Sequence, residues 1–501
     1  MAQFTGQNSF TRTMDKSLRI VEMQKAMASQ QLGTLGISAG PGQLGVQSLE
    51  GQLYILTYGD SEFKILQDLQ KVPAFNWIHE FNVLQNYGSS VGAAIGAGAL
   101  PPVNNSYFKR GWAEIKFYGD YRAIPQQLLE IESAVGNYVG VETRNSLMSL
   151  MGKINHQIYW GDSSLNQYQF DGINKQVPAQ FPGNIIDARG GNLTPGILEQ
   201  AALQVRNNWG NPAFCNFYCD PAVITPFTLA YIPNQRAIPM LWEGTAGNPF
   251  AAWDTQYGRI KLRDDRFTER EPFVGTSPIQ ALSYVPQGLP PTPTAAPTVA
   301  APASDASSQF TAGGSGVPAT PGGYFSYAYA YKNSVGLGMV SPASTPVNIQ
   351  NGQSAQLTIP TAGVNPAPQS IVIYRSNGAV PGTSSSYAGA AATFTPNLAN
   401  FQIMTEIPAV ISTNGTTYTD ENANLPGTYT GFLVNTTKDG MHLAKLGDVQ
   451  KMELAPVTLA YQFLSIWYGC LIVPAAQWSV LVRNLAGGNG TTVPVNAAYA
   501  A

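Results

Sequence analysis

Length, composition and charge narrow the class of protein before any motif is considered. The chain has 501 residues, enough for about three domains, and its 27 Lys and Arg against 30 Asp and Glu give a formal net charge of −3 at pH 7. It lacks the basic excess of proteins that bind nucleic acid by neutralising phosphates, which favours proteins as partners. Its 50 glycines and 36 prolines indicate many turns and strands with few long helices, hence a β-rich α+β class.

Residues 1–50 predict an arm with little core of its own. The segment is polar, with two isolated aromatic residues, Phe4 and Phe10, and continues as a short helix from Met14 to about Gln31 before several glycines. An arm with exposed apolar side chains usually docks on another subunit or element, and simple disorder is the alternative. The segment shows no apolar core followed by a cleavage site, so no signal peptide is visible.

A long glycine-rich excursion is predicted at about residues 78–122. Strand-like sequence stands on both sides of a loop containing Gly88, Gly92, Gly96 and Gly98. Such an excursion buries little within its own domain, and we expect it to find its core on a neighbouring subunit. A phosphate loop is excluded because no Gly-Lys-Ser/Thr follows. With the two arm aromatics, the candidate inter-subunit contacts are Trp77, Tyr87, Lys109 and Arg110.

Residues 131–160 carry the longest sustained helical period in the chain. Apolar residues recur in steps of three and four, which predicts one buried stripe. At about 1.5 Å per residue the helix is roughly 40 Å long and can serve as a spine for other elements. The predicted stripe consists of Ile131, Val135, Val139, Leu147, Met151, Ile154 and Ile158, and Gly161 ends the helix.

Residues 190–285 predict the first part of a second domain. Thr194 is a plausible N-cap with Pro195 in the first turn of a helix, and a strand covered on both sides follows in FCNFYCD. From Arg259 the sequence predicts an exposed charged hairpin, whose acidic residues form a solvated face and no metal site. Those acidic residues are Asp264, Asp265, Glu269 and Glu271.

A change of composition at about residue 286 marks a domain boundary. Residues 286–323 are rich in Pro, Ala, Ser and Gly, and short strands at close spacing follow up to about residue 430. They predict a β-sandwich of about 110 residues. The apolar strands of residues 431–501 are too few for a domain and complete the sheet begun before residue 285, so the sandwich is an insertion.

The sequence shows none of the constellations that carry common enzyme chemistry. His79, His156 and His442 are scattered, without a second ligand at metal-binding spacing, and no nucleophile or cofactor motif appears. Three cysteines, Cys215, Cys219 and Cys470, are expected to be reduced and buried. We therefore expect no enzyme, no cofactor and no metal. The one reactive alternative is an amide crosslink from Lys109 to an Asn of another subunit.

Several segments, in this order, resemble the major capsid proteins of tailed bacteriophages with the Hong Kong 97-type fold, which encapsulins share. They are SLEGQLYILTYGDSEFKILQDLQKVPA before the glycine-rich loop, YWGDSSLNQYQFDGI after the long helix, IIDARGGNLTPGILEQAA with NPAFCNFYCDPAVITPF, and LAPVTLAYQFLSIWYGCLIVPAAQWSVLVRNL. The segments AYAYKNSVGLGMVSPAS, IVIYRS and TTYTDENANLPG are similar to immunoglobulin-like or fibronectin-like domains of phage structural proteins.

The resemblance implies both a set of parts and a function. The parts are an N-terminal arm at 1–50, an extended loop and peripheral domain at 51–189, an axial domain at 190–285 continued at 431–501, and an immunoglobulin-like insertion at 286–430. The implied function is a virion shell subunit that forms hexamers and pentamers, with portal, scaffolding or decoration proteins as partners. Packaged double-stranded DNA is enclosed with little specific contact, and no membrane is involved. The alternative is a tail, baseplate or adhesion protein whose insertion binds glycans through aromatics in 324–331.

Overall fold

The computed structural model describes residues 59–88, 97, 100, 103–130, 138–235, 252–270, 288–311, 322–376, 398, 401–455 and 459–487. By its contacts the chain divides into one unit of residues 57–126 and 140–501 and another of residues 1–56 and 127–139. Of the second unit the structure describes helix α3 (Gln126–Glu130) and the start of helix α4. The predicted arm, with Phe4 and Phe10, lies outside the described residues.

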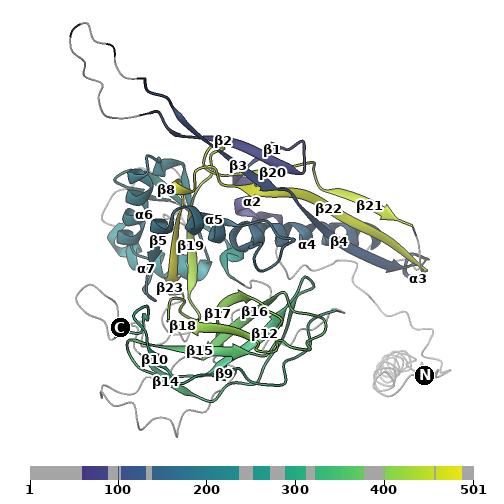
Figure 1. Ribbon diagram of the computed structural model, residues 1–501. Coiled ribbons are helices and arrows are strands. Elements are labelled where there is room, and N and C mark those ends of the chain that lie inside the picture. Colours follow the sequence, from purple (N-terminus) through teal and green to yellow (C-terminus); the bar gives the residue numbers. More distant parts are fainter. Residues whose placement is uncertain are drawn as a thin grey trace, which may run out of the picture. The chain divides into compact units, whose positions relative to one another are not determined.

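A sheet built on the long strand β22 (Ala460–Ile472) forms one half of the structure (Figure 1). Strand β4 (Lys116–Pro125) pairs antiparallel with it from Lys116 opposite Gly469 to Pro125 opposite Ala460. Three further strands complete the sheet, β20 (His442–Lys445), β21 (Gln450–Leu454) and, parallel to β20, β1 (Gln70–Pro73). Short helices η2 (Asp60–Glu62) and α2 (Lys64–Asp68) precede β1.

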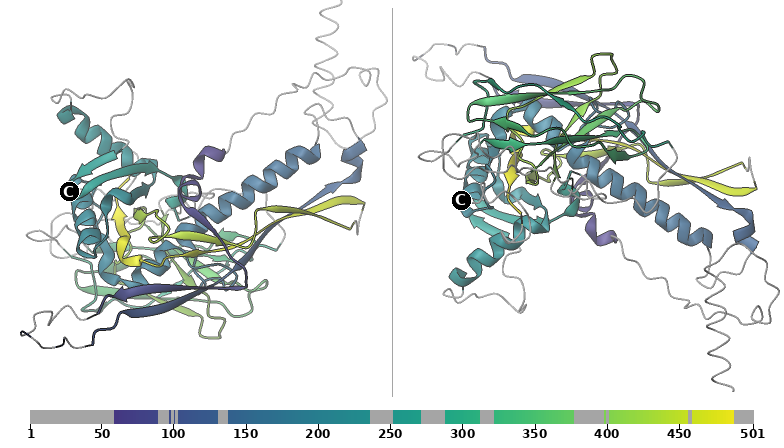
Figure 2. Two further views of the ribbon diagram at one scale, coloured as in Figure 1. Left: turned by 90° about the horizontal axis from the view of Figure 1, so that it is seen from above. Right: turned by 90° about the horizontal axis from the view of Figure 1, so that it is seen from below.

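Helix α4 (Tyr138–Trp160) lies along this sheet in both further views (Figure 2). Leu150, Ile154 and Ile158 share one core with Trp467 and Leu471 of β22. The predicted spine helix is therefore present over its described part, and its predicted stripe is partly wrong because Leu147 is exposed and Leu150 is buried in its place.

Gly161 ends α4 as predicted. Its amide donates to the Gln157 carbonyl at 2.8 Å, and the Gly172 amide donates to the Gly161 carbonyl at 2.7 Å. A Cβ atom at Gly172 would lie 2.6 Å from the Gln157 carbonyl oxygen, so this close backbone approach requires glycine.

The second sheet joins strands from both ends of the sequence. Its order is β5 (Ile185–Asp187), β23 (Val480–Leu485), β19 (Tyr429–Asn435), β6 (Cys215–Cys219), β8 (Gly258–Asp264) and β7 (Ala252–Thr255). All five residues of β6 are buried, as expected for a strand covered on both sides. Strands β19 and β23 complete a sheet begun before residue 285, as predicted, but the prediction is wrong for β22, which pairs with β4 in the first sheet and not with the strands of residues 190–285.

Helices cover this second sheet. Helix α6 (Pro195–Asn207) begins at Thr194, whose hydroxyl accepts from the Ile197 amide, so the predicted N-cap is confirmed. Helices α5 (Ile173–Gln180) and α7 (Pro221–Gln235) and the short turns η3 (Pro182–Asn184), η4 (Pro212–Phe214) and η8 (Ala476–Trp478) complete this part.

The predicted exposed charged hairpin is wrong in one decisive respect. Strand β8 lies inside the second sheet, parallel to β6, and ends at Asp264. Asp265, which follows it, is 0% exposed and caps the turn η5 (Arg266–Thr268) by accepting from the Phe267 amide at 2.9 Å. The prediction failed for Asp265 because the composition of a charged segment does not show which of its side chains faces the core.

Strands β2 (Ile78–Asn86) and β3 (Tyr107–Glu114) form a separate two-stranded antiparallel hairpin, drawn in dark blue in Figure 1. Its register runs from Ile78 opposite Glu114 to Asn86 opposite Tyr107. The hairpin falls within the segment expected as an extended loop at about 78–122, but residues 116–122 belong to β4 of the first sheet, and most of the glycine-rich tip lies outside the described residues.

Residues 288–420 form strands with cores of their own. One sheet has the order β13 (Leu337–Val340), β12 (Tyr327–Lys332), β16 (Ser370–Ser376) and β17 (Phe401–Pro408). A second has β10 (Ala303–Ser304), β15 (Gln353–Ile359) and β18 (Thr416–Asp420), with β9 (Thr298–Val299) beside β15. Strands β11 (Gly323–Phe325) and β14 (Val347–Ile349) form a separate two-stranded sheet. Tyr327, Tyr329 and Ile373 of the first pack against Leu357 and Ile359 of the second.

The class predicted from composition is confirmed, since the described residues contain few helices and many strands. Along the chain the structure has an exposed hairpin, a long helix on a long-stranded sheet, and a second sheet completed by the end of the chain. None of the helices that the structure describes is long and apolar enough to cross a membrane.

Candidate subunit interface and polar cavity

The hairpin β2–β3 exposes large aromatic side chains. Tyr87 is 85% exposed, Trp112 65% and Trp77 61%, and Tyr107 and Phe108 of β3 are exposed as well. Phe81 and Ala113 of the hairpin pack against the core of the first sheet, while most of its other side chains are exposed. Exposed aromatics of this kind are typical of surfaces that bind a partner.

The base of this hairpin is fixed to the body of the subunit. The Trp77 ring lies edge-on to Phe117 of β4 at 5.1 Å, and Phe117 lies edge-on to Tyr468 of β22 at 5.0 Å between centroids. The Ile115 amide also donates to the Trp77 carbonyl at 3.0 Å. Trp77 therefore anchors the hairpin within its own chain, while Tyr87 stands at the far end near the glycine-rich tip.

Lys109 and Arg110 lie on β3, and both are exposed. Arg110 forms an ion pair with Glu80 of β2 at 3.3 Å, which ties the two strands together across the hairpin. Lys109 stands opposite Val83. The structure thus brings four of the six candidate contacts, Trp77, Tyr87, Lys109 and Arg110, onto one hairpin. Their role between subunits stays a prediction, as does the Lys109 crosslink.

The exposed hairpin aromatics Trp112, Tyr107 and Phe108 were missed in the sequence analysis. Their signal was present, because three large aromatics within six residues beside a glycine-rich loop exceed what a small hairpin can bury.

No group of three or more His, Cys, Asp and Glu side chains that could hold a metal ion occurs among the described residues. Two of the histidines donate to backbone carbonyls, His156 through Nε2 to Arg270 and His442 through Nδ1 to Lys438, each at 2.8 Å. His79 lies on β2. The three histidines therefore stand on different elements with no shared ligand geometry.

The three cysteines are free and buried, which confirms the prediction made for them. Burial raises the pKa of the Cys215 and Cys470 thiols to about 12 and raises that of Cys219 as well. Thiols with such pKa values stay protonated at neutral pH and are poor nucleophiles.

A buried polar cluster joins α4 to the end of β8. Asp265 accepts a hydrogen bond from the Tyr159 hydroxyl at 2.9 Å, and the Asn155 amide lies 3.5 Å from the same oxygen. Burial raises the pKa of Asp265 to about 6, although these hydrogen bonds and the Lys64 ammonium oppose the shift. The cluster is structural, since each of its polar groups is used to hold one element to another.

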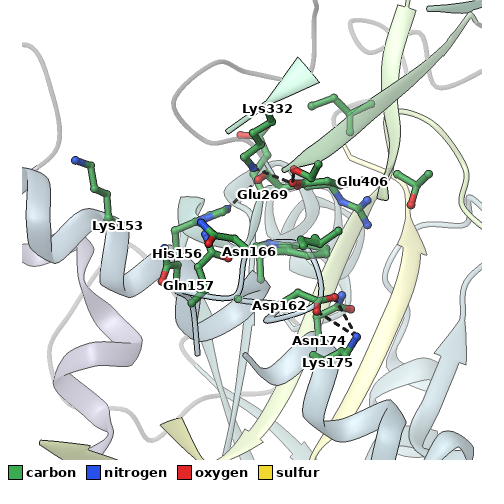
Figure 3. Close-up of a pocket in the computed structure, with 18 of the residues that line it drawn as sticks. Lys153, His156, Gln157, Asp162, Asn166, Asn174, Lys175, Glu269, Lys332 and Glu406 are labelled. Carbon is green, nitrogen blue, oxygen red and sulfur yellow. Dashed lines mark hydrogen bonds and ion pairs between the residues drawn. The ribbon is translucent and has the colours of Figure 1, made fainter. Parts of the chain in front are cut away.

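A polar cavity of about 690 Å³ lies beside the end of α4 (Figure 3). Helix α4 contributes Lys153, His156 and Gln157 to its lining, and the strands of residues 288–420 contribute Lys332 and Glu406. Figure 3 shows two ion pairs in its wall. Lys175 lies 3.1 Å from Asp162, and Lys332 lies 3.1 Å from Glu406.

Two cavity side chains have displaced pKa values. Burial lowers the pKa of His156 to about 4, assisted by the Lys332 charge, so its imidazole is neutral at pH 7. Burial acts to raise the pKa of Glu406, but the Lys332 ammonium, the Ser370 hydroxyl and the Arg270 guanidinium together lower it below its ordinary value. The cavity wall therefore holds a neutral imidazole beside an ionised carboxylate.

Known proteins similar to this chain come from bacteriophage heads. The provisionally named major capsid protein of Enterococcus phage phiEF24C is 21% identical over 459 residues, covering 88% of this chain and 90% of that one. The major capsid proteins of Staphylococcus phages S25-3 and K are each 21% identical over 462 residues, covering 89% of this chain and 90% of theirs. No protein-family model matches the chain.

Solved structures that superpose on this chain do so only distantly. The capsid of a native GTA particle covers 91% of this chain at 8% identity with a TM-score of 0.41. The SrpI encapsulin complex from Synechococcus elongatus PCC 7942 covers 92% at 10% identity with a TM-score of 0.36. Scores this low add no weight, so the relationship stands on the sequence relatives.

The exposed aromatic hairpin is a feature typical of surfaces that bind a partner. The sequence relatives are more specific. The chain is related, over about nine tenths of its length, to the major capsid proteins of phages. The resemblance noted from the sequence is thereby confirmed.

Proposed function

We propose that the chain is the major capsid protein of a tailed double-stranded DNA bacteriophage and forms the wall of its icosahedral head. The observation that carries the proposal is the relationship to phage major capsid proteins along nearly the whole chain. In the proposed head, copies of the chain form hexamers and pentamers. The protein is made in the host cytoplasm and resides in the virion.

The proposed mechanism is geometric. The hairpin β2–β3 extends its aromatics onto a neighbouring subunit, where Tyr87, Trp112 and Phe108 become buried, and the arm of residues 1–50 adds a second overlap. A net charge of only −3 suits a wall in which many copies of one surface must meet without strong repulsion. When closed symmetry repeats one self-complementary contact between all copies, the copies form a shell.

The enclosed DNA and the other head proteins are part of the same proposal. The near balance of 27 basic and 30 acidic residues supports confinement of DNA with few phosphate contacts. Portal, scaffolding and decoration proteins are the further partners expected of such a shell. No catalytic step and no cofactor is proposed for the chain.

We also propose that residues 286–430 are an inserted immunoglobulin-like domain that decorates the outer surface. Two observations support this proposal. The sheet of β12 and β16 packs face to face on the sheet of β15 and β18, and in the sequence both lie between β8 and β23, which belong to one other sheet. The alternative of a glycan-binding tail or adhesion protein relied on exposed aromatics in 324–331. Tyr324, Phe325, Tyr327, Tyr329 and Tyr331 are all at most 5% exposed, which disfavours it.

Electron microscopy of the purified full chain tests the proposal. Expression in a bacterial host, with the phage's scaffolding protein supplied if needed, is expected to give closed particles with fivefold and sixfold capsomers. Tubes, free trimers or monomers, both with and without the scaffolding protein, would instead favour the tail or adhesion alternative.

A further inference from the structure

Helix α6 ends in a Schellman motif, a hydrogen-bonded turn that commonly closes helices. Asn208 is its C-cap. The Trp209 amide donates to the Arg206 carbonyl at 3.0 Å, and the Gly210 amide donates to the Val205 carbonyl at 2.9 Å. The residue after the C-cap has a left-handed backbone in this motif and is usually glycine, which has no Cβ to clash. In this chain that residue is Trp209, with a φ of +62°.

The side chain of Trp209 gains nothing within the described residues from this backbone. The other described residues with a side chain and a left-handed backbone all use that side chain. Asn484 donates to Asp187 at 2.8 Å, and Arg189 forms an ion pair with the same carboxylate at 3.3 Å. Asn422 accepts from a buried guanidinium at 2.8 Å. The Trp209 indole makes no hydrogen bond or ring contact with the described residues and is 88% exposed. Backbone strain at an exposed aromatic residue points to a role outside its own fold.

The backbone that carries Trp209 is fixed to the turns beside it. The Asn208 side-chain amide donates to Asn184 Oδ1 at 3.2 Å and to the Gln477 carbonyl at 3.3 Å. The Trp478 indole donates to the Asn208 carbonyl at 2.9 Å. A rigid aromatic side chain on a fixed backbone loses little conformational entropy when a partner covers it. Trp209 is therefore presented as a preorganised anchor.

Two further exposed aromatics lie at the same end of the second sheet. Strands β5, β6, β8 and β23 all begin there, because β5 is parallel to β23, β8 is parallel to β6, and β19 is antiparallel to both β6 and β23. Phe214 of η4, directly before β6, is 56% exposed, and Phe181, directly before η3, is 36% exposed. We call Trp209, Phe214 and Phe181 the aromatic end.

The exposed charges at this end of the sheet have both signs. The basic side chains are Arg206, Arg259 and Lys438, and the acidic ones are Asp254 and Asp439. Arg259 and Asp254 form an ion pair at 3.7 Å. Such a surface can meet a second copy of itself without strong repulsion, whereas a nucleic acid would favour a basic excess.

We infer that the aromatic end is a contact surface between copies of this chain, separate from the hairpin β2–β3, with Trp209 as its anchor. The inference rests on the proposed shell function. One heterologous contact repeated about one axis closes a ring, and rings of a single chain join into a shell only through a further contact. The hairpin supplies one such surface, and the aromatic end supplies another.

Hydroxyl-radical labelling of the full chain, read by mass spectrometry, tests whether a copy covers Trp209. The exposed indole should be oxidised in the dissociated subunit and should lose this oxidation in assemblies of the purified chain, whatever their shape. Trp467, which is 6% exposed in the first core, gives the baseline of a covered indole in both states.

Two substitutions separate the anchor from the strain. W209A removes the indole and keeps a Cβ on the left-handed backbone, whereas W209G removes both. Each should raise the subunit concentration needed for assembly by more than about tenfold, as expected when an aromatic anchor is lost. The dissociated W209G subunit should unfold at a higher urea concentration than W209A, because glycine adopts this backbone without strain. Y168A, which removes an aromatic that is 61% exposed after α4, is the control and should leave the assembly threshold unchanged.

Three results would overturn the inference. They are assembly thresholds of W209A and W209G equal to that of the parent, an indole that stays oxidisable in assemblies of the purified chain, and a W209G subunit that unfolds at or below the urea concentration of W209A. A chain that stays monomeric at every concentration would contradict both this contact and the proposed shell. Open tubes in which Trp209 is protected would contradict the closed shell alone and would support the contact between copies.

Discussion

Asp265 shows how strongly a single buried carboxylate ties two elements together. It accepts from the Tyr159 hydroxyl of α4 and from the Phe267 amide of its own turn, and it is fully buried. In the sequence it stands in a run of charges, and local composition predicted a solvated face. Only the tertiary packing of α4 over the end of β8 removes it from water, which no local pattern reveals.

We predict that D265N changes how stability depends on pH. The folded-state pKa of Asp265 is about 6 and lies above the ordinary 3.8, so the folded state holds this proton more tightly than the unfolded state. Its contribution to stability is fully present below pH 3.8 and is lost as pH rises through 6. A shift of about two pKa units corresponds to a loss on the order of 3 kcal/mol. The free energy of unfolding of D265N relative to wild type should rise by that amount between pH 4 and 7.

Urea denaturation of the dissociated subunit at several pH values measures this difference. Parallel pH profiles for D265N and wild type would contradict the assignment of the raised pKa to Asp265.

His156 supplies a second pH prediction with the opposite sign. Its folded-state pKa of about 4 lies below the ordinary 6.5, so its contribution is present above pH 6.5 and is lost as pH falls towards 4. The charged groups that face it are Lys332 of β12, Glu406 of β17, and Glu269 and Arg270 after η5. H156Q should reduce the acid sensitivity of the cavity region, as seen by backbone hydrogen exchange of α4 at pH 5 against pH 7. Equal acid sensitivity in H156Q and wild type would show that protonation of His156 does not cause the acid sensitivity of this region.

At the scale of elements, helix α4 shows what periodicity predicts and where it stops. The spacing of apolar residues correctly predicted a long helix, its end at Gly161 and burial of Ile154 and Ile158. The spacing wrongly predicted that Leu147 is buried in the middle of the stripe, whereas Leu150 is the buried residue. Both are leucines three residues apart, and only the position of β22 decides which of them meets the core.

The two leucines give a matched pair of substitutions. L150A should destabilise the subunit by about 2–5 kcal/mol, because it opens a cavity in a core where Leu150 is 1% exposed. L147A, on the exposed side of the same helix, should cost less than about 1 kcal/mol. Chemical denaturation of both variants measures the difference, and equal losses would mean that α4 presents another face to the sheet.

At the scale of the whole molecule, the order of parts was predictable and the contacts between them were not. The hairpin and the completion of the second sheet by the end of the chain were predicted, whereas the pairing of β22 with β4 was not. The meeting of His156, Arg270 and Glu406 was not, since the three residues stand on three elements separated by more than a hundred residues in sequence. Local patterns carry no information about such long-range packing.

The exposed hairpin also yields a prediction about assembly. W112S should raise the subunit concentration needed for shell formation by more than about tenfold, as expected when a central aromatic anchor is lost. The stability of the dissociated subunit should change little, because Trp112 is 65% exposed there. Y168S, which removes an aromatic that is 61% exposed outside the hairpin, is the control. Light scattering against concentration gives the threshold, and equal thresholds for W112S and Y168S would exclude Trp112 as an anchor.

Hydrogen exchange of the hairpin in assembled and dissociated protein tests most directly the claim that this surface is completed by a neighbouring copy. Most side chains of this two-stranded hairpin are exposed in the single chain, so amides of residues 78–86 and 107–114 should exchange rapidly in the dissociated subunit. In the shell the same amides should exchange much more slowly, while the β22 amides change little. Equal protection of the hairpin in both states would contradict the account, because the hairpin would then already be complete within a single chain.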